Sequence, residues 1–139
     1  MMNKNKRARH LTIVKTNHNL QEERAKKLLE KHLHSEGWET TIAWGRKHGT
    51  DIVAKKRNKE WRIEVKGCGS LNPMRVNYFL AILGEILQRM DEEDIKYSIA
   101  LPDMKQYRDL WENLPALAKK RTGISMLFVR RNGQVEEVK

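Results

Sequence analysis

Two carboxylates and one lysine stand at matching ends of two neighbouring segments in which apolar and polar residues alternate. Residues 49–54 read Gly-Thr-Asp-Ile-Val-Ala and place Asp51 near their start, while residues 61–67 read Trp-Arg-Ile-Glu-Val-Lys-Gly and carry Glu64 and Lys66 near their end. This alternation is typical of β-strands with one buried face. Because side chains two residues apart on a strand point to the same side, Glu64 and Lys66 share one face.

The register of the expected β-hairpin follows from its polar turn, residues 56–59. If these four residues form the loop, Lys55 pairs with Glu60, and counting outward brings Asp51 opposite Glu64. Cross-strand partners lie roughly 5 Å apart at Cβ, so the two carboxylates and the lysine converge on one spot. The opposite face is apolar and consists of Ile52, Ala54, Trp61, Ile63 and Val65.

This group of side chains suits a divalent cation. Hard cations prefer oxygen ligands, and Mg²⁺ in particular is usually held by one or two carboxylates together with water and substrate phosphate. In a chain with 33% charged residues, the same side chains are also compatible with solvated strand positions and an ordinary surface ion pair. The sequence around the hairpin favours the metal site.

The rest of the chain supplies regular elements on both sides of the hairpin. Helices are predicted at 17–36, 75–90 and 103–121. Asn17 or Asn19 caps the first helix, and the third is interrupted near Pro115. Further strands are predicted at 38–44, 96–101, 124–130 and 134–138, and a short strand at 11–15 is a further candidate. The first helix directs Ala25, Leu28, Leu29, His32 and Leu33 inward. This order, α-β-β-β-α-β with a C-terminal α-β-β extension, predicts an α/β fold with a mixed central sheet flanked by helices. We expect one domain over residues 11–139, preceded by a basic flexible arm at 1–10.

The hairpin and the elements around it resemble the PD-(D/E)XK nuclease superfamily. Asp51 follows a glycine by two residues at the start of one strand, and Glu64, Lys66 and a glycine close the next. The small stand-alone members, such as archaeal Holliday-junction resolvases and methyl-directed restriction enzymes, are the most similar. The resemblance covers roughly residues 20–101 and implies a restriction-endonuclease-like fold. Thr50 replaces the proline that gives the superfamily its name, at a position that varies widely in the family.

The resemblance also implies site residues on the two helices that flank the hairpin. Family members commonly place a Glu on the first helix, facing the metal, and Glu22 and Glu23 are the candidates, with Glu23 slightly preferred. A stabilising role in the first helical turn explains this pair equally well. The second core helix often carries a Gln on its site-facing side. Gln88 keeps that residue type, Glu85 lies on the same polar stripe, and a solvated helix face accounts for either residue too.

The chemistry and the resemblance together imply hydrolysis of a phosphodiester. Mg²⁺, for which Mn²⁺ would substitute, would be held by Asp51, Glu64 and, as the family implies, the carbonyl of Val65. Such an ion can lower the pKa of a bound water and neutralise charge that develops on the phosphate oxygens. Lys66 would orient that water or stabilise the pentacovalent transition state. The sequence leaves open whether one or two ions act.

The net charge of +10 is concentrated in the half of the chain that carries the hairpin. Residues 1–66 contain 17 Lys and Arg against 8 Asp and Glu, whereas residues 67–139 contain 11 against 10. Because polyanion binding is largely driven by counterion release from phosphates, this distribution suits a nucleic-acid substrate, DNA more than RNA. The expected phosphate contacts, for which solubilising loop charge is an equal alternative, are Arg46, Lys47, Lys55, Lys56, Arg57 and Lys59.

Several other classes of protein are disfavoured. No apolar run approaches the length of a membrane span, and residues 1–9 are charged with no apolar stretch behind them, unlike a signal peptide. We therefore expect no membrane partner and a cytoplasmic location. Cys68 is the only cysteine, which excludes an intrachain disulfide and a cysteine-rich zinc site.

The sequence thus predicts a metal-dependent DNA endonuclease of the restriction, recombination or repair type. The alternative is a non-catalytic nucleic-acid-binding or complex-assembly subunit on the same fold, although such a protein has no reason to retain Asp51, Glu64 and Lys66 together. A third interpretation is a protein-binding domain that presents Trp111 from the helix at 103–121, where a core position is the more common outcome. A homodimer and a larger complex both remain open.

Overall fold

The computed structural model describes residues 20–45 and 47–139. The predicted arm at 1–10, the strand at 11–15, the caps Asn17 and Asn19 and the phosphate contact Arg46 lie outside the described residues. In chain order the elements are α2 (Glu22–Ser35), β1 (Glu39–Ile42), β2 (Ile52–Lys56), β3 (Lys59–Val65), α3 (Asn72–Arg89), β4 (Ile95–Pro102), α4 (Lys105–Asn113), α5 (Ala116–Thr122), β5 (Ser125–Val129) and β6 (Val135–Val138). No helix in this part of the chain combines the length and the apolar composition needed to cross a membrane.

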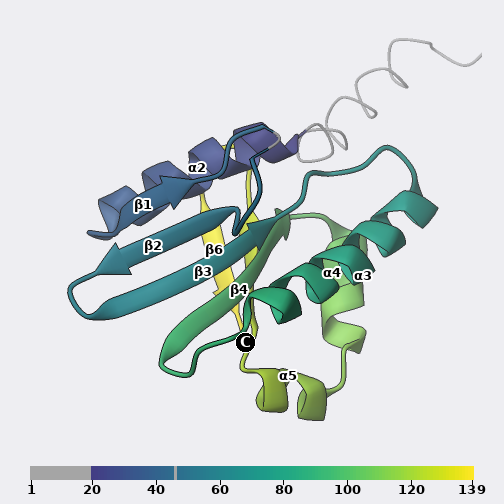
Figure 1. Cartoon of the computed structure of the whole chain (residues 1–139). Helices are drawn as coiled ribbons and strands as arrows, with labels where there is room; N and C mark the ends of the chain where they lie inside the picture. Colours follow the sequence, from purple (N-terminus) through teal and green to yellow (C-terminus); the bar gives the residue numbers. More distant parts are fainter. Residues whose placement is uncertain (1–19, 46) are drawn as a thin grey trace, which may run out of the picture.

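The six strands form one mixed sheet in the order β1-β2-β3-β4-β5-β6. Strands β1 to β3 pair antiparallel, β3, β4 and β5 pair parallel, and β6 returns antiparallel to β5. Helix α2 covers one face of this sheet, and α3 and α4 cover the other (Figure 1). The predicted α/β fold and its core order α-β-β-β-α-β are confirmed. The C-terminal helix of the extension is divided into α4 and α5, with Pro115 at the start of α5.

The β2–β3 hairpin has the register predicted from its turn. Lys55 pairs with Glu60, and Ile52 pairs with Ile63. The ladder extends one pair further than expected, to Lys56 and Lys59, which leaves a two-residue turn that begins at Arg57, with φ 56°. A tight turn of this kind matches the right-handed twist of the two strands and fixes their register.

Hydrophobic cores fill both faces of the sheet, as a sheet between two helical layers requires. Strand β4 shows the alternation, because Ala100 packs toward α2 whereas Ile99 and Leu101 pack toward α3 and α4. The core under α2 contains the apolar hairpin face that was predicted, namely Ile52, Ala54, Trp61, Ile63 and Val65. Glu64, between two residues of that face, therefore points to the side of the sheet that α3 covers.

Helix α2 begins at Glu22, and its N-cap is Gln21 rather than Asn17 or Asn19. The glutamates Glu22 and Glu23 thus occupy the first turn, where the positive end of the helix dipole favours acidic residues. The helix ends just before Gly37, which adopts φ 89°, a conformation that favours glycine.

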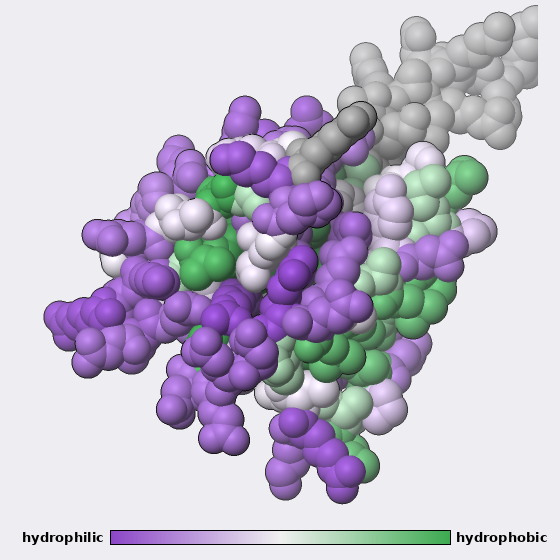
Figure 2. All heavy atoms as spheres, viewed as in Figure 1, coloured by the Kyte–Doolittle hydropathy of each residue, from purple (hydrophilic) through white to green (hydrophobic). Residues whose placement is uncertain are grey.

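Trp111 is buried between α4 and the sheet and is only 1% exposed. The interpretation in which Trp111 forms a partner-binding surface is therefore wrong; its helix turns this face toward the core. Figure 2 shows apolar side chains gathered on the outside of α3, while most of the remaining visible surface is hydrophilic. The exposed large apolar residues of α3 are Val76, Leu80 and Leu87.

Candidate active site

Three carboxylates meet where the β2–β3 hairpin ends against α3. Asp51, just before β2, Glu64, near the end of β3, and Glu85, on α3, each offer a carboxylate oxygen, and these oxygens lie within 4.8 Å of one another. Two of the three are the residues predicted to face each other across the hairpin. The third, Glu85, lies on a helix whose position relative to the hairpin could not be predicted from the sequence.

Asp51 is held in place by the backbone of the opposite strand. Its Oδ2 accepts a hydrogen bond from the N–H of Val65 at 2.8 Å. Since the N–H and C=O of one strand residue point to the same side, the carbonyl of Val65 also faces Asp51 and not β4. That placement agrees with the role of Val65 as a carbonyl ligand, which the family resemblance implies.

Glu64 is 2% exposed, which is unusual for a carboxylate at the end of a strand. Burial raises the pKa of its carboxyl group to about 8, and the hydrogen bond with Asp51 acts in the same direction. Nε of Arg89 donates a hydrogen bond to Oε1 of Glu64 at 2.8 Å and partly opposes this rise. Burial thus disfavours the ionised form of Glu64 even with Arg89 in contact.

The donors of this group fit a hard divalent cation. All three are carboxylate oxygens, the ligand type that Mg²⁺ and Mn²⁺ prefer. Burial is the main cause of the raised pKa of Glu64, and the neighbouring Asp51 adds to it, so an added cation would stabilise the ionised carboxylate. A cation bound between them would have to displace or share the contact that Arg89 now makes.

Lys66 lies on the same side of the site as Glu85, and its Nζ is 3.2 Å from Oε1 of that residue. Burial lowers the pKa of the Lys66 ammonium, but Glu85 and the more distant Glu22 and Asp51 outweigh this effect and raise it. Lys66 is therefore positively charged at neutral pH. The predicted convergence of Asp51, Glu64 and Lys66 on one face is present in the structure.

Of the two glutamates in the first turn of α2, Glu22 is the one that faces the site. Burial raises the pKa of Glu22, and its electrostatic partners include Asp51 and Lys66. Glu23 is 52% exposed and accepts a hydrogen bond from the N–H of Gly45 at 3.2 Å. The slight preference for Glu23 is thus corrected to Glu22. Adjacent residues on a helix point in different directions, so the choice depends on how α2 is rotated about its axis.

On α3 the structure favours Glu85 over Gln88. Glu85 belongs to the carboxylate group, and Arg89, one turn further along the helix, contacts Glu64 and the carbonyl of Gly49. Gln88 lies between these two turns and is exposed. Residues three and four apart are both neighbours on a helix, so spacing alone would allow Gln88 or Arg89 beside Glu85, and in the structure it is Arg89 that contacts Glu64.

Sequence reasoning missed two cations at the site, Arg89 and Lys26. Lys26, on α2, is almost completely buried, and its Nζ lies 3.4 Å from Oδ1 of Asp51. A signal for it was present: Lys26 precedes Leu29 and Leu33 by three and seven residues, so it shares the apolar stripe of α2. His32, predicted to face inward, instead lies partly exposed and pairs with Glu36 at 2.5 Å.

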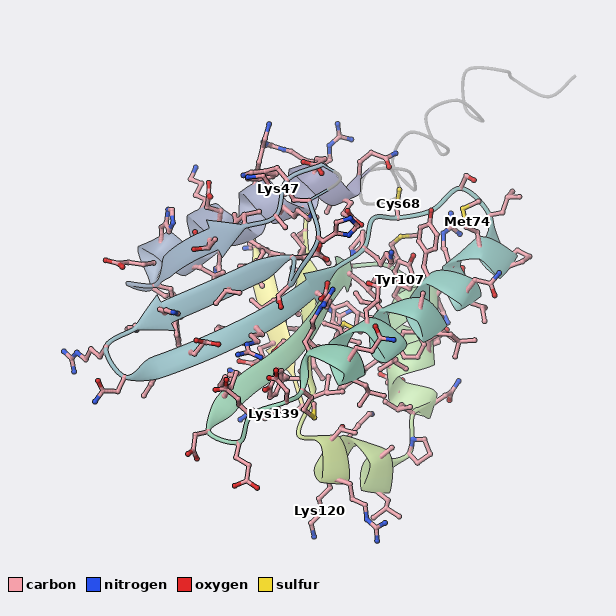
Figure 3. The ribbon with its side chains drawn as sticks, in the orientation of Figure 1. Lys47, Cys68, Met74, Tyr107, Lys120 and Lys139 are labelled. Carbon is pink, nitrogen blue, oxygen red and sulfur yellow. The ribbon has the colours of Figure 1, made fainter. Side chains whose placement is uncertain are left out.

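The predicted phosphate contacts are not gathered at the carboxylates. Lys47 follows β1 in the loop that leads to Asp51 (Figure 3), whereas the other described members of this set surround the hairpin turn. Those residues are Lys55, Lys56, Arg57 and Lys59. Lys56 is engaged locally, since its Nζ donates to the carbonyl of Glu36 at 2.7 Å and lies 5.4 Å from the ring centroid of Trp38.

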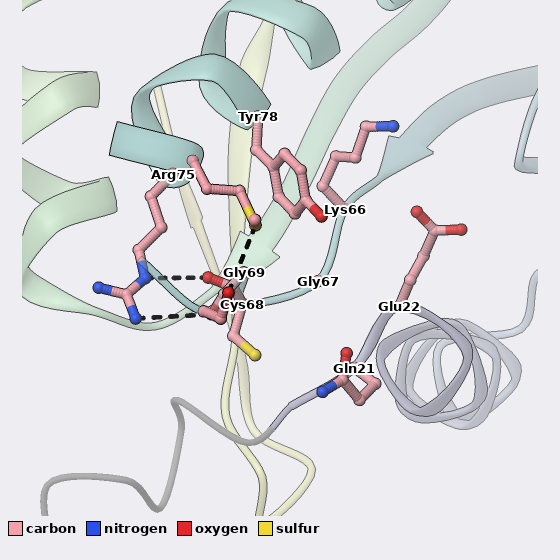
Figure 4. Close-up of a pocket in the computed structure, with 10 residues that line it drawn as sticks. Gln21, Glu22, Lys66, Gly67, Cys68, Gly69, Arg75 and Tyr78 are labelled. Carbon is pink, nitrogen blue, oxygen red and sulfur yellow. Dashed lines mark hydrogen bonds between the residues drawn. The ribbon is translucent and has the colours of Figure 1, made fainter. Parts of the chain in front are cut away.

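A cavity of about 540 Å³ opens beside Lys66, between the start of α2 and the start of α3 (Figure 4). Lys66, Glu22 and Tyr78 line it, together with the loop that follows β3. Cys68, in that loop, is buried, and burial raises the pKa of its thiol, so the thiol is protonated at neutral pH and is a poor nucleophile. The cavity gives a substrate access to Lys66 from one side.

The raised pKa of Glu64 predicts that, in EDTA, the folded protein loses stability as the pH rises. A carboxyl group with a pKa of about 8 in the folded chain and an ordinary value of 4.5 in the unfolded chain binds its proton more tightly when folded. The contribution of this carboxyl group to the free energy of unfolding is complete below pH 4.5 and is lost as the pH rises through about 8. Melting temperatures measured in EDTA between about pH 5 and pH 8.5 should therefore fall, and the Glu64→Gln variant should show a flatter profile. An identical pH dependence in both proteins would contradict the burial of an acid pair.

Comparisons with known proteins show the fold. No protein-family model matches this chain, and no curated protein sequence matches it. An XisH family protein from Nostoc punctiforme has a solved structure that is 16% identical, with a TM-score of 0.55 over 82% of this chain and 98% of that one. An fdxN element excision controlling factor protein from Anabaena variabilis is 19% identical, with a TM-score of 0.57 over 81% and 96%. The chain therefore shares the α/β fold of these two proteins along nearly their whole length.

Proposed function

We propose that this protein is a metal-dependent endonuclease that hydrolyses phosphodiester bonds of DNA, built on the PD-(D/E)XK plan. The observation that carries this proposal is the convergence of Asp51, Glu64 and Lys66 at the end of one hairpin, joined by Glu85. Glu64 is buried among these groups and its pKa is strongly raised, and strongly perturbed pKa values cluster at functional sites.

The metal would be Mg²⁺, with Mn²⁺ as a substitute, held by Asp51, Glu64 and the carbonyl of Val65, with Glu85 close enough to join them. When bound, the ion supplies Lewis acidity toward a phosphate oxygen and lowers the pKa of water. The protein's part is to hold the ligands still. The Val65 N–H fixes Asp51, and Arg89 fixes Glu64.

Lys66 supplies a positive charge next to the position of the phosphate. A fixed ammonium in a partly dry site stabilises the negative charge that develops on phosphate oxygens during hydrolysis. Glu85 keeps this ammonium oriented through the 3.2 Å contact between Nζ and Oε1. Glu22 lies on the other side of the cavity and contributes further negative potential that keeps Lys66 charged.

The hairpin turn is placed to bind the DNA backbone away from the cleaved bond. Lys55 lies four residues along β2 from Asp51, and Lys59 lies five residues along β3 from Glu64. At a rise of about 3.3 Å per residue, these distances amount to roughly 13–17 Å. Successive phosphates of one DNA strand advance about 3.4 Å along the helix axis, so the turn would reach phosphates four or five nucleotides away.

Replacing both Lys55 and Lys59 with Ala should weaken binding to all DNA sequences alike. Both side chains are exposed, and the ion pair of Lys55 with Glu60, at 3.8 Å, lies at the surface. Loss of two phosphate contacts should reduce the slope of log K against log salt by about two units. Fluorescence anisotropy with a labelled duplex at several salt concentrations, in EDTA, measures this slope without cleavage.

The matched control replaces two exposed lysines outside the hairpin: Lys105 on α4, and Lys120 on α5, which is labelled in Figure 3. This variant has the same net charge as the Lys55 and Lys59 variant and should keep the parent's slope. If the hairpin variant also keeps it, the phosphate contacts lie elsewhere, and deletion of residues 1–9 tests the basic arm directly.

One assay tests the proposed activity. The purified protein is incubated with linear, nicked, branched and single-stranded DNA and with RNA, in Mg²⁺, in Mn²⁺ or in EDTA. We expect cleavage of DNA that requires a divalent ion and stops in EDTA. Absence of cleavage on every substrate in both metals, by a protein that is folded and binds DNA, would overturn the proposal.

The alternative function, a non-catalytic DNA-binding or complex-assembly subunit, is favoured by one observation. Arg89 and Lys66 already pair with Glu64 and Glu85, so the acids have protein partners without a metal. In a purely structural network, divalent ions would not change the melting temperature. A rise in the parent's melting temperature with Mg²⁺ or Mn²⁺ would instead show an ion bound to the folded state.

A further inference from the structure

Lys26 carries a buried ammonium group at the edge of the candidate metal site. Its side chain is 1% exposed, and Nζ donates a hydrogen bond to the carbonyl of Ala43 at 2.7 Å. Three carboxylates surround the same nitrogen: Oδ1 of Asp51 at 3.4 Å, Oε2 of Glu22 at 3.5 Å and Oε1 of Glu23 at 3.9 Å. A lysine is almost never buried to this extent unless acids compensate its charge.

The two oxygens of Asp51 have different partners. Oδ2 accepts the N–H of Val65, and Oδ1 faces the ammonium of Lys26. Asp51 belongs to the group formed with Glu64 and Glu85, and Lys26 connects it to the first turn of α2. Asp51 therefore lies between two positions that favour positive charge, and a protein cation fills one of them.

In two-metal hydrolytic sites, the two ions lie roughly 3.5–4 Å apart. A second ion that shared Asp51 would need oxygen ligands from α2, where the carboxylate of Glu22 lies nearer to Lys26 than that of Glu23. The ammonium of Lys26 already occupies the space between Asp51 and Glu22. An ion and an ammonium group cannot share this space, because both are positive and the lysine is enclosed.

We propose that Lys26 takes the place of a second metal ion, so that the site holds one divalent cation. This inference rests on the proposed metal site and specifies its stoichiometry. Lys26 acts as a positioning residue: it neutralises Glu22, fixes Oδ1 of Asp51 and leaves the side toward Glu64 and Glu85 for the ion.

The test counts bound Mn²⁺ on the full chain, by isothermal titration calorimetry and by the electron paramagnetic resonance signal of free Mn²⁺, with no DNA present. The parent should bind one ion and Glu64→Gln none. Lys26→Met keeps the length of the side chain but removes its charge, which leaves Asp51 and Glu22 facing each other; it should bind two ions. Lys26→Arg keeps the charge and should bind one.

The matched control is Lys27→Met, which changes the exposed neighbouring lysine and should bind one ion like the parent. Two ions on the parent, or one ion on a folded Lys26→Met, would overturn the inference. If Lys26→Met fails to fold, the count on the parent decides: one ion supports the inference and two overturn it. No Mn²⁺ binding by the parent would instead refute the proposed metal site, while two ions would leave that site intact.

Discussion

Glu64→Gln is expected to abolish DNA cleavage, with a loss of at least ~1000-fold, because a metal ligand supplies several kcal/mol of transition-state stabilisation. The change keeps the shape of the side chain and its place beside Arg89, but it removes the ligand's negative charge. Asp51→Asn should have an effect of the same size. Initial rates on the best DNA substrate, at saturating Mg²⁺, measure both losses.

Folding and binding should survive these substitutions. Glu64→Gln removes an acid whose raised pKa already disfavours its charge, so its melting temperature in EDTA should not fall. DNA affinity in EDTA should match or exceed that of the parent, since a negative charge near the backbone is lost. Glu112→Gln, an exposed acid on α4, is the matched control and should remain fully active. Robust cleavage by purified Glu64→Gln would show that Glu64 is not a ligand.

Lys66→Ala should slow cleavage by at least ~100-fold, the usual effect of removing one fixed charge from a transition state. In its proposed role the charge acts on the phosphate as negative charge develops, so the loss should appear in kcat more than in KM. Single-turnover rates at saturating protein separate the two effects. Lys105→Ala, which removes an exposed lysine on α4, controls for net charge.

Removal of Lys66 also frees Glu85 from its partner. If Lys66 serves only to neutralise Glu85, the double variant Lys66→Ala with Glu85→Gln should recover activity. If Lys66 acts on the phosphate, the double variant should stay as slow as Lys66→Ala. Full activity of Lys66→Ala itself would leave the lysine without a catalytic role.

The hairpin, its register and its two faces could be predicted because the interactions that specify them are local. Alternation along 49–54 and 61–67 decides which side chains are buried, and the turn between them decides which residues pair. The convergence of Asp51, Glu64 and Lys66 follows from these two facts alone. The order of helices and strands was predictable for the same reason, since each element shows its own periodicity.

The contributions of the helices to the site could not be predicted with the same precision. Glu22 and Glu23 differ by about 100° around α2, so the choice between them requires the exact packing of the helix on the sheet. Glu85 and Gln88 pose the same problem on α3. Arg89 and Lys26 were missed because charged residues are usually assigned to solvent, and only the packed structure shows which acids enclose them.

The site draws its parts from segments that come together at different stages of folding. Asp51 and Glu64 are joined by a tight hairpin, and hairpins form in roughly 1–10 μs. Lys26 and Arg89 arrive only when α2 and α3 dock on the sheet, whose central parallel strands pair across long crossovers and are slow to form. We therefore expect the acids to meet before these two cations reach them. Their repulsion would then disfavour the isolated hairpin, and docking of α2 and α3 would relieve it, so that the hairpin gains its full stability only in the folded domain.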